Sequence, residues 1–516
     1  MKRILLINLF MFSMCFAQQN VLISNANNPS EPSICINPNN TNQLIAGSNI
    51  NNFYSSNDAG ITWSSGLLTS TYGVWGDPTI MADNSNNFYF FHLSNPPSSV
   101  SSGNWIDRIV CQKSSNLGIT WSAGTATGKN GSKAQDKQWS AFDKGNNLMY
   151  LTWTQFDVYG SSNPINKSII RFSKSADFGA TWSVPQKINT IDGTCIDDSS
   201  TVEGAVPAVG PAGQVYVAWA GLNKIVFKKS LDFGVTWPTT ETLVTTTPGW
   251  DFGVSGLDRT NGLPITACDL SPTATNGTIY VNWADQRNGI NDTDIFISKS
   301  TDQGATWTSP IRVNNDSASN QQFLTWMTID QTNGYIYIVF YDRRNYSNDE
   351  TDIYLAYSTD GGTTFTNKKI SATSFTPTAT VFFGDYTNIT AHNGIIRPIW
   401  GRMDGGQNSI WTALISQSQL NTNQFDADEK SDEISNYPNP VVNDESYFSF
   451  KLYKESKISI IIYDISGKEV LKVIDSKSYP MGKHVITLKN KNLQKGNYIY
   501  TIKSDYYLKS KKMIVN

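Results

Sequence analysis

The stretch Ser56-Asn57-Asp58-Ala59-Gly60-Ile61-Thr62-Trp63 is the first of six copies of one phrase, Ser-x-Asp-x-Gly-x-Thr-Trp. The other copies run from Ser114 to Trp121, Ser175 to Trp182, Ser230 to Trp237, Ser300 to Trp307 and Ser358 to Phe365. The key residue of each copy recurs at intervals of about 60 residues, at Asp58, Asn116, Asp177, Asp232, Asp302 and Asp360. A repeat of this length indicates an array of similar structural units.

Each copy has the chemistry of a tight turn. The Asp carboxylate can accept backbone N–H groups, and the Gly two residues later can take the positive φ that the turn needs. We expect the closing Trp to pack between neighbouring sheets. Short β-rich runs and turns alternate between the copies, which predicts one four-stranded propeller blade per unit. The phrase is therefore interpreted as structural, not catalytic.

The number of blades follows from the starts of the inner strands. These lie near Glu31, Asp77, Lys137, Gly204, Leu263, Leu324 and Asp385, which gives seven units for six copies of the phrase. The last unit, residues 384–416, has only three predicted strands, and residues 20–24 resemble the missing fourth strand. We predict an all-β, seven-bladed propeller that the N-terminal strand closes, removing the open sheet edge. A six-bladed ring is the alternative.

Composition and the termini define the domain organisation. Only 16% of the 516 residues are charged and the net charge is −3, which is typical of an extracellular all-β protein and argues against a nucleic-acid partner. Residues 1–17 have the charged start and short apolar run of a secretory signal, and no other segment is expected to cross a membrane. The propeller is predicted over 18–416, a linker over 417–435 and a small β-sandwich over 436–516. We expect a monomer.

Two resemblances to known families follow from these motifs. The six-fold phrase resembles the Asp box, or BNR repeat, of bacterial sialidases and related propellers. The Lys-rich C-terminal segment, with Asn436-Tyr437-Pro438-Asn439-Pro440 and Leu493-Gln494-Lys495-Gly496-Asn497-Tyr498, resembles the type A sorting domain of the type IX secretion system. This second resemblance implies export by that machinery to the medium or the outer-membrane surface. An ordinary β-sandwich binding module is the alternative for this segment.

Carboxylates gather at the predicted starts of the inner strands, around one mouth of the central channel. The repeat alignment places Glu31, Asp77 and Asp385 at equivalent positions and Asp136 and Glu203 one residue away from theirs. Crowded carboxylates raise one another's pKa, as a general acid requires. We therefore name Asp77, Asp385, Glu203 and Glu31 as candidate catalytic residues. The alternative is that Asp and Glu serve only the turn that starts the strand, as in Asp77-Pro78.

Arginines and aromatic residues are predicted on the same face. Arginines suit recognition of a carboxylate or sulfate, and aromatic faces stack on sugar rings. The candidate substrate-binding residues are Arg343, Arg402, Arg287, Arg344, Trp75, Trp139 and Tyr386, with Trp105, Trp250, Tyr341 and Arg397 beside them. Arg287 and Arg344 each follow an Asp, so a salt bridge that holds the loop is the competing interpretation, and about half of the aromatic residues are expected to pack between blades.

Cofactor signals are weak. The acidic runs 291–294 and 348–352 could hold Ca²⁺ through oxygen ligands, or they are solvated loops. The cysteines Cys35, Cys111, Cys195 and Cys268 have no metal-site or disulfide spacing. We expect no cofactor and no other metal.

The arginine triad implied by the sialidase resemblance is incomplete. In that family the first arginine stands near the start of the first blade, and here the stretch is Glu31-Pro32-Ser33-Ile34-Cys35. We therefore expect a glycoside hydrolase that acts on extracellular glycans without this triad. A non-catalytic glycan-binding or adhesin propeller is the first alternative, and a polysaccharide lyase is the second.

Overall fold

The computed structural model describes residues 19–96, 105–317, 319–420, 434–442, 445–452, 455–489, 493–504 and 508–515. The chain divides into two compact units, one of residues Asn20–Ser416 and one that contains Gln417–Asn516. The predicted signal peptide, 1–17, lies outside the described residues. The boundaries drawn from the sequence stay predictions.

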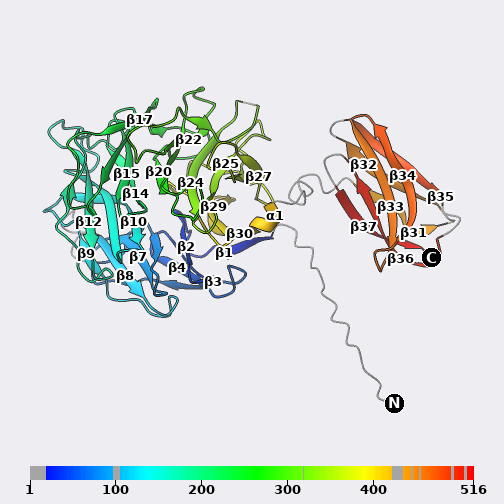
Figure 1. Ribbon diagram of the computed structural model, residues 1–516, viewed down its shortest axis with the longest axis horizontal. Helices are drawn as coiled ribbons and strands as arrows, with labels where there is room; N and C mark the ends of the chain where they lie inside the picture. The colour runs from blue at the N-terminus through cyan, green and yellow to red at the C-terminus, as the bar shows by residue number, and fades with distance from the viewer. Residues whose placement is uncertain are drawn as a thin grey trace, which may run out of the picture. The chain divides into compact units, whose positions relative to one another are not determined.

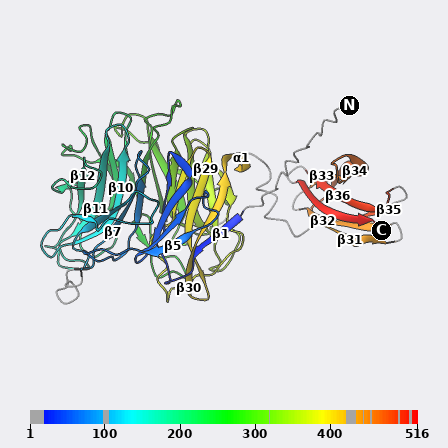
Figure 2. The same ribbon diagram turned by 90° about the horizontal axis from the view of Figure 1, so that it is seen from below.

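Seven four-stranded antiparallel sheets form the first unit (Figures 1 and 2). The first two blades are β2 (Ser33–Asn37), β3 (Asn40–Ser48), β4 (Asn52–Ser56), β5 (Ser64–Leu67), and β6 (Thr79–Ala82), β7 (Phe88–Leu93), β8 (Ile109–Ser114), β9 (Thr125–Thr127). The third and fourth are β10 (Ala134–Asp143), β11 (Leu148–Phe156), β12 (Ser168–Ser175), β13 (Gln186–Lys187), and β14 (Glu203–Val209), β15 (Val215–Gly221), β16 (Lys224–Ser230), β17 (Thr242–Thr246). The fifth and sixth are β20 (Ile265–Cys268), β21 (Ile279–Asp285), β22 (Asp294–Ser300), β23 (Ile311–Arg312), and β24 (Gln322–Asp330), β25 (Tyr335–Asp342), β26 (Asp352–Ser358), β27 (Thr366–Lys369).

The seventh blade joins the two ends of the propeller. Its strands are β28 (Asn388–His392), β29 (Ile395–Asp404), β30 (Gln407–Ser416) and the N-terminal β1 (Gln19–Ser24), and β1 pairs with β30. Both ribbon views place the blue β1 beside the yellow β30 (Figures 1 and 2). The seven-bladed prediction and its closure by the N-terminal strand are confirmed, and the six-bladed alternative is wrong.

The apolar core lies between neighbouring blades. One cluster joins Tyr89 and Phe91 of β7 to Leu151 and Trp153 of β11, and all four side chains are fully buried. Because both faces of a blade are covered, β14 and β15 are buried along their whole length, which explains their continuous apolar sequences.

The repeated phrase forms the turn between the third and fourth strands of a blade. In the third blade Asp177 Oδ1 accepts from the Ser175 hydroxyl and from Thr181 N, both at 2.8 Å. Gly179 has a φ of 80° and donates its N–H to Ser175 Oγ at 2.9 Å. Asn116 keeps the same acceptor, since Thr120 N donates to its Oδ1 at 2.9 Å. The turn therefore depends on the side-chain oxygen more than on its charge.

The closing tryptophans pack across blade boundaries. Trp121 meets Phe53 of the first blade edge to face at 5.7 Å, and Trp182 meets Phe91 of the second blade at 5.8 Å. Each turn is thus attached to the blade before its own.

The described residues of the second unit form seven strands over an apolar core. These are β31 (Ser435–Val442), β32 (Glu445–Leu452), β33 (Ser456–Asp464), β34 (Glu469–Tyr479), β35 (Gly482–Lys489), β36 (Gly496–Lys503) and β37 (Leu508–Val515). Phe448 of β32 and Tyr500 of β36 lie 4.7 Å apart within that core. A short helix, α1 (Gln417–Leu420), follows β30. Among the described residues there is no helix with the length and apolarity of a membrane span.

Candidate functional site at the channel mouth

The inner strands begin with a repeated strained backbone. Glu31, Asp77 and Lys137 each stand two residues before the regular start of their inner-strand ladder and have φ values of 52°, 52° and 53°. Such conformations cost about 1 to 3 kcal/mol for a non-glycine residue and cluster at functional sites. In β10 a register shift between Asp136 and Trp139 accompanies the strained residue, which allows consecutive side chains to reach the mouth.

Lys137 connects carboxylates from two other blades. Its Nζ lies 2.5 Å from Asp385 Oδ2 and 3.5 Å from Asp77 Oδ2. All three side chains are at most 10% exposed. The structure thus brings the aligned residues Asp77 and Asp385 together at one mouth. Asp385 stands three residues before its strand, β28, whereas Glu31 and Asp77 stand two residues before theirs.

A hairpin inserted between the fourth and fifth blades supplies the second cation. Its strands are β18 (Asp251–Phe252) and β19 (Thr260–Asn261). Arg259 donates two hydrogen bonds to the Asp385 carboxylate, from Nε to Oδ1 at 2.8 Å and from Nη2 to Oδ2 at 2.5 Å. Asn261 Nδ2 donates to the Asp385 carbonyl at 2.8 Å. Because these contacts join the fourth-to-fifth blade connection to the seventh blade, the hairpin crosses the mouth.

Glu31 is the most enclosed carboxyl of the mouth. It is 1% exposed, its Oε2 accepts from Asn49 Nδ2, and its Oε1 accepts from the backbone N–H of Asp385 at 3.2 Å. Burial and then the Asp77 carboxylate raise the pKa of Glu31 well above its usual range. The site therefore favours the protonated form of Glu31.

Asp385 titrates in the opposite direction. Burial opposes its ionisation, yet Lys137 and Arg259 together lower the pKa of Asp385 to about 2. The mouth thus contains one carboxyl group whose pKa is raised and one whose pKa is lowered, and such opposed shifts are typical of sites for acid–base chemistry.

Further acidic side chains, which form no ion pair with a cation in the described part of the chain, adjoin this cluster. Burial, with the charges of Asp77 and Asp197 acting against that of Lys137, raises the pKa of Asp136 to about 8. Burial and then Asp197 raise the pKa of Glu203 well above its usual range. Glu203 Oε2 is buried and accepts no hydrogen bond from a nitrogen or hydroxyl donor among the described residues. We call the group of Asp136, Asp197 and Glu203 the acidic pocket.

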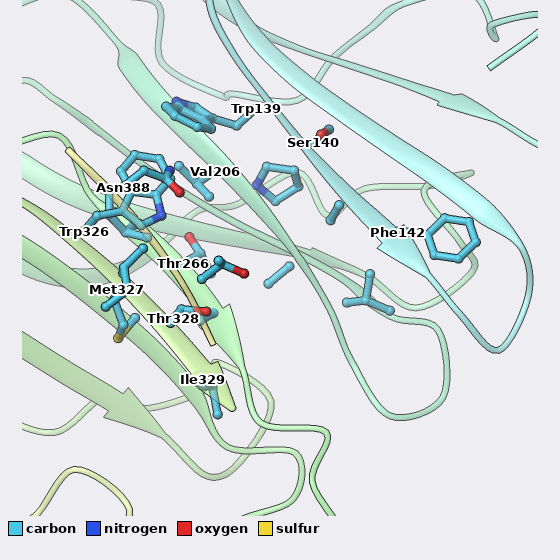
Figure 3. Close-up of a pocket in the computed structure, with 18 of the residues that line it drawn as sticks. Trp139, Ser140, Phe142, Val206, Thr266, Trp326, Met327, Thr328, Ile329 and Asn388 are labelled. Carbon is cyan, nitrogen blue, oxygen red and sulfur yellow. The ribbon is translucent and has the colours of Figure 1, made fainter. Parts of the chain in front are cut away.

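Three aromatic rings close the channel beneath the mouth. Trp139 lies 4.1 Å from Trp326 and 5.2 Å from Tyr386 between ring centroids. Below them a cavity of about 590 Å³ runs between the inner strands, lined by Thr266, Met327 and others, and Figure 3 shows Trp139 and Trp326 together at one end of it. The predicted sugar-stacking residues Trp139 and Tyr386 are thus brought together as the floor of the mouth.

The predicted substrate-binding arginines are all engaged within the protein. Arg287 binds the buried carboxylate of Asp285, and Arg344 binds that of Asp342, each through Nε and Nη2. Arg402 pairs with Asp404 at 2.6 Å. These residues hold loops outside the channel and do not enter the mouth cluster.

Arg343 and Arg397 are buried rather than available to a ligand. Arg343 is 3% exposed and donates to Ser255 O at 2.8 Å and to Asp349 Oδ1 at 3.1 Å, which anchors the inserted hairpin to the sixth blade. Arg397 donates to Ala59 O at 2.6 Å within the first Asp-box turn.

Of the remaining aromatic candidates, two are exposed and two are buried. Trp75 and Trp105 are 41% and 39% exposed and lie 5.5 Å apart, edge to face. Trp250 and Tyr341 are buried, and Tyr341 donates to Gly401 O of the seventh blade at 2.9 Å. Only the first pair offers a surface on which a ligand could stack.

Two carboxylates of the acidic runs proposed for Ca²⁺ bind other side chains of the protein. Asp294 accepts from Asn314 Nδ2 at 2.6 Å, and Asp352 pairs with Lys369 at 3.0 Å. In the described part of the chain no group of three or more His, Cys, Asp or Glu side chains is arranged to hold a metal ion.

Sequence reasoning missed Lys137, Arg259 and Asp197 as site residues. Lys137 could have been found from the repeat alignment, because it occupies the same repeat position as Glu31 and Asp77. Arg259 could not, because the inserted hairpin has no counterpart in the other blades.

Comparison with known proteins identifies the C-terminal segment. Residues 435–516 match the family described as secretion system C-terminal sorting domain, which confirms the assignment made from the Lys-rich motifs. No curated protein matches the chain.

Several solved structures resemble the propeller. A protein of unknown function from Dyadobacter fermentans is 14% identical, with 66% of this chain and 93% of that one covered and a TM-score of 0.45. An ulvan lyase is 12% identical over 77% and 96% of the two chains, with a TM-score of 0.48. The NanB sialidase from Streptococcus pneumoniae is 9% identical over 72% and 83%, with a TM-score of 0.44. Likeness at this level does not transfer an activity.

Proposed function

We propose that this protein is an exported glycoside hydrolase whose active site is the channel mouth. Glu31 acts as the general acid and Asp77 as the carboxylate that stabilises or attacks the anomeric carbon. The observation that carries the proposal is the cluster of carboxyl groups at the mouth, in which Lys137 and Arg259 bind Asp385 while burial and the Asp77 carboxylate raise the pKa of Glu31.

The roles follow from the contacts. Both oxygens of Asp385 are bound by Arg259, and Oδ2 also by Lys137, so Asp385 positions the cations rather than reacting. Asp77 contacts Lys137 more loosely, at 3.5 Å, and adjoins Glu31. Glu31 would protonate the glycosidic oxygen, and water would complete hydrolysis by giving its proton back to Glu31.

The proposed acid and its partner lie side by side at the mouth. The Asp77 carboxylate acts directly on Glu31 and raises its pKa. The location of the enzyme follows from its sorting domain, which would direct it through the type IX system to the medium or the cell surface.

A non-catalytic glycan-binding propeller is the second candidate. The burial of Glu31 and Asp77 beneath the inserted hairpin favours it, because a substrate must displace or pass that hairpin to reach them. A lyase is disfavoured, since His92 is fully buried between Leu93 O and Gln112 and lies within the β7 core.

The experiment is release of reducing sugar from a panel of glycans by the wild-type protein, Asp77→Asn and Asp385→Asn. Loss of activity in Asp77→Asn in a folded variant supports the hydrolase. If the wild type releases nothing yet is retained on a glycan array, the binding propeller is correct.

A further inference from the structure

The acidic pocket and the exposed tryptophans are joined by one tyrosine. The Tyr159 hydroxyl donates to Asp197 Oδ2 at 2.6 Å, and the Tyr159 ring lies 6.1 Å from that of Trp105. Trp105 in turn contacts Trp75. A chain of contacts therefore leads from two exposed indoles, through the Tyr159 phenol, to the Asp197 carboxyl.

The charges of the mouth are unevenly distributed. Lys137 and Arg259 are both bound to Asp385. Across the part of the chain that the structure describes, no lysine or arginine forms an ion pair with Asp136, Asp197 or Glu203. A carboxylate or sulfate on a ligand would therefore meet acidic groups here, and the nearby cation, Lys137, is already bound to Asp385.

Within the described residues, the acidic pocket lacks a hydrogen-bond donor for Glu203. It is 1% exposed, and its Oε2 accepts no hydrogen bond from a nitrogen or hydroxyl donor among the described residues. Its side-chain neighbour is the carboxyl group of Asp197, which can satisfy it only by sharing a proton. An unsatisfied buried carboxyl oxygen is unfavourable until a donor reaches it. A cationic N–H donor would bind that oxygen and favour ionisation of the neighbouring carboxyl groups.

We infer that the acidic pocket, together with Tyr159, Trp105 and Trp75, is a subsite for the protonated primary amine of an amino sugar. Carboxylates supply charge-assisted hydrogen bonds, and aromatic faces attract an ammonium group and the apolar face of the sugar. This inference deepens the proposed function, on which it rests for the kind of ligand, and it predicts discrimination against N-acetylated, uronate and sulfated glycans.

Calorimetry on the full chain tests the inference with two amine probes, glucosamine and galactosamine hexamers, and their N-acetylated counterparts. The measurements are made at a pH at which the sugar amine is protonated. We expect at least one amine probe to bind about 10- to 100-fold more tightly than its acetylated counterpart, because only the amine fills the pocket with a charge. Equal affinities, or tighter binding of both acetylated probes, would overturn the inference.

Variants locate the binding. Glu203→Gln and Asp136→Asn should each remove most of the preference for the amine over the acetylated probe. Asp177→Asn is the matched control, because it removes a carboxylate from the third blade at the opposite end of the channel, where the second blade naturally has Asn116. Thermal unfolding shows that each variant is folded. An amine preference that persists in both pocket variants would place the amine elsewhere and contradict the assignment.

Hydrolysis is scored separately. Amine-selective binding without hydrolysis of any glycan would leave the subsite standing and reject the hydrolase. Hydrolysis with no selectivity for the amine would support the hydrolase and reject the subsite.

Discussion

The ammonium of Lys137 in the third blade lies 2.5 Å from Oδ2 of Asp385 in the seventh, across the mouth of the channel. This contact joins blades that are not neighbours in the ring. The buried Lys137 ammonium also stabilises a second carboxylate, since Asp77 lies 3.5 Å from the same nitrogen.

Replacing Lys137 by Met should destabilise the protein. The ammonium is only 10% exposed, and removing it leaves Asp77 without a cation. Loss of one partner of a buried ion pair costs about 3 to 5 kcal/mol in the free energy of unfolding, which urea denaturation measures. Lys129→Met is the control, because this side chain is 58% exposed and its ion pair should be worth less than about 1 kcal/mol. Equal effects of the two substitutions would contradict the assigned role.

The raised pKa of Asp136 predicts a stability that falls with rising pH. Its carboxyl ionises near pH 4 in the unfolded chain, but burial raises its pKa to about 8 in the folded protein. Between these values the unfolded state has lost the proton and the folded state keeps it, so raising the pH favours unfolding. Glu31 and Glu203 shift in the same direction.

Urea midpoints measured between pH 5 and 8 check this sign. Asp136→Asn cannot ionise and should show a shallower decline than the wild type. A wild-type midpoint that rises over this range would show that the mouth carboxyls are ionised in the folded state.

The Asp-box turn should tolerate an amide. In Asp177→Asn the oxygen that accepts Thr181 N is kept, as in the natural Asn116 turn, so the free energy of unfolding should change little. Asp177→Ala removes the acceptor and should cost about 1 kcal/mol. Thermal or urea unfolding of the two variants gives the comparison, and equal losses would mean that the charge, not the oxygen, holds the turn.

Removal of the N-terminal strand should open the ring. A chain that starts at Ala26 lacks β1, exposing the edge of β30 and losing Ile23 from the core that also contains Ile410. Compared with a chain that starts at Gln18, it should unfold at lower temperature and aggregate in size-exclusion chromatography. Unchanged behaviour would show that the three-stranded blade is sufficient.

The fold was predictable because its signals repeat. The Asp-box phrase marks each turn between third and fourth strands, and the resemblance of residues 20–24 to other fourth strands indicated the closure. The convergence of Glu31 and Asp77 followed from the same alignment, because equivalent positions of a ring face one axis.

The partners of these carboxylates were less accessible to sequence reasoning. Lys137 stands at a repeat position but was overlooked in a search for acids. Arg259 reaches Asp385 from a hairpin that only one blade connection carries, so no periodicity reveals it. Arg343 was expected to bind a ligand, yet it anchors that hairpin, because its neighbour Ser255 is brought near only by the folded chain.

The most direct test of the central claim compares wild type with Glu31→Gln on two substrates of one sugar. One substrate is a natural glycan, whose leaving group needs a proton, and the other is an aryl glycoside with an acidic phenol, whose leaving group does not. Gln imitates the protonated carboxyl, so the variant should fold normally. The account predicts a loss in kcat of about 10²- to 10⁴-fold on the glycan and a much smaller loss on the aryl glycoside. Equal rates of wild type and Glu31→Gln on the glycan would contradict the assignment of Glu31 as the general acid and of the channel mouth as the active site.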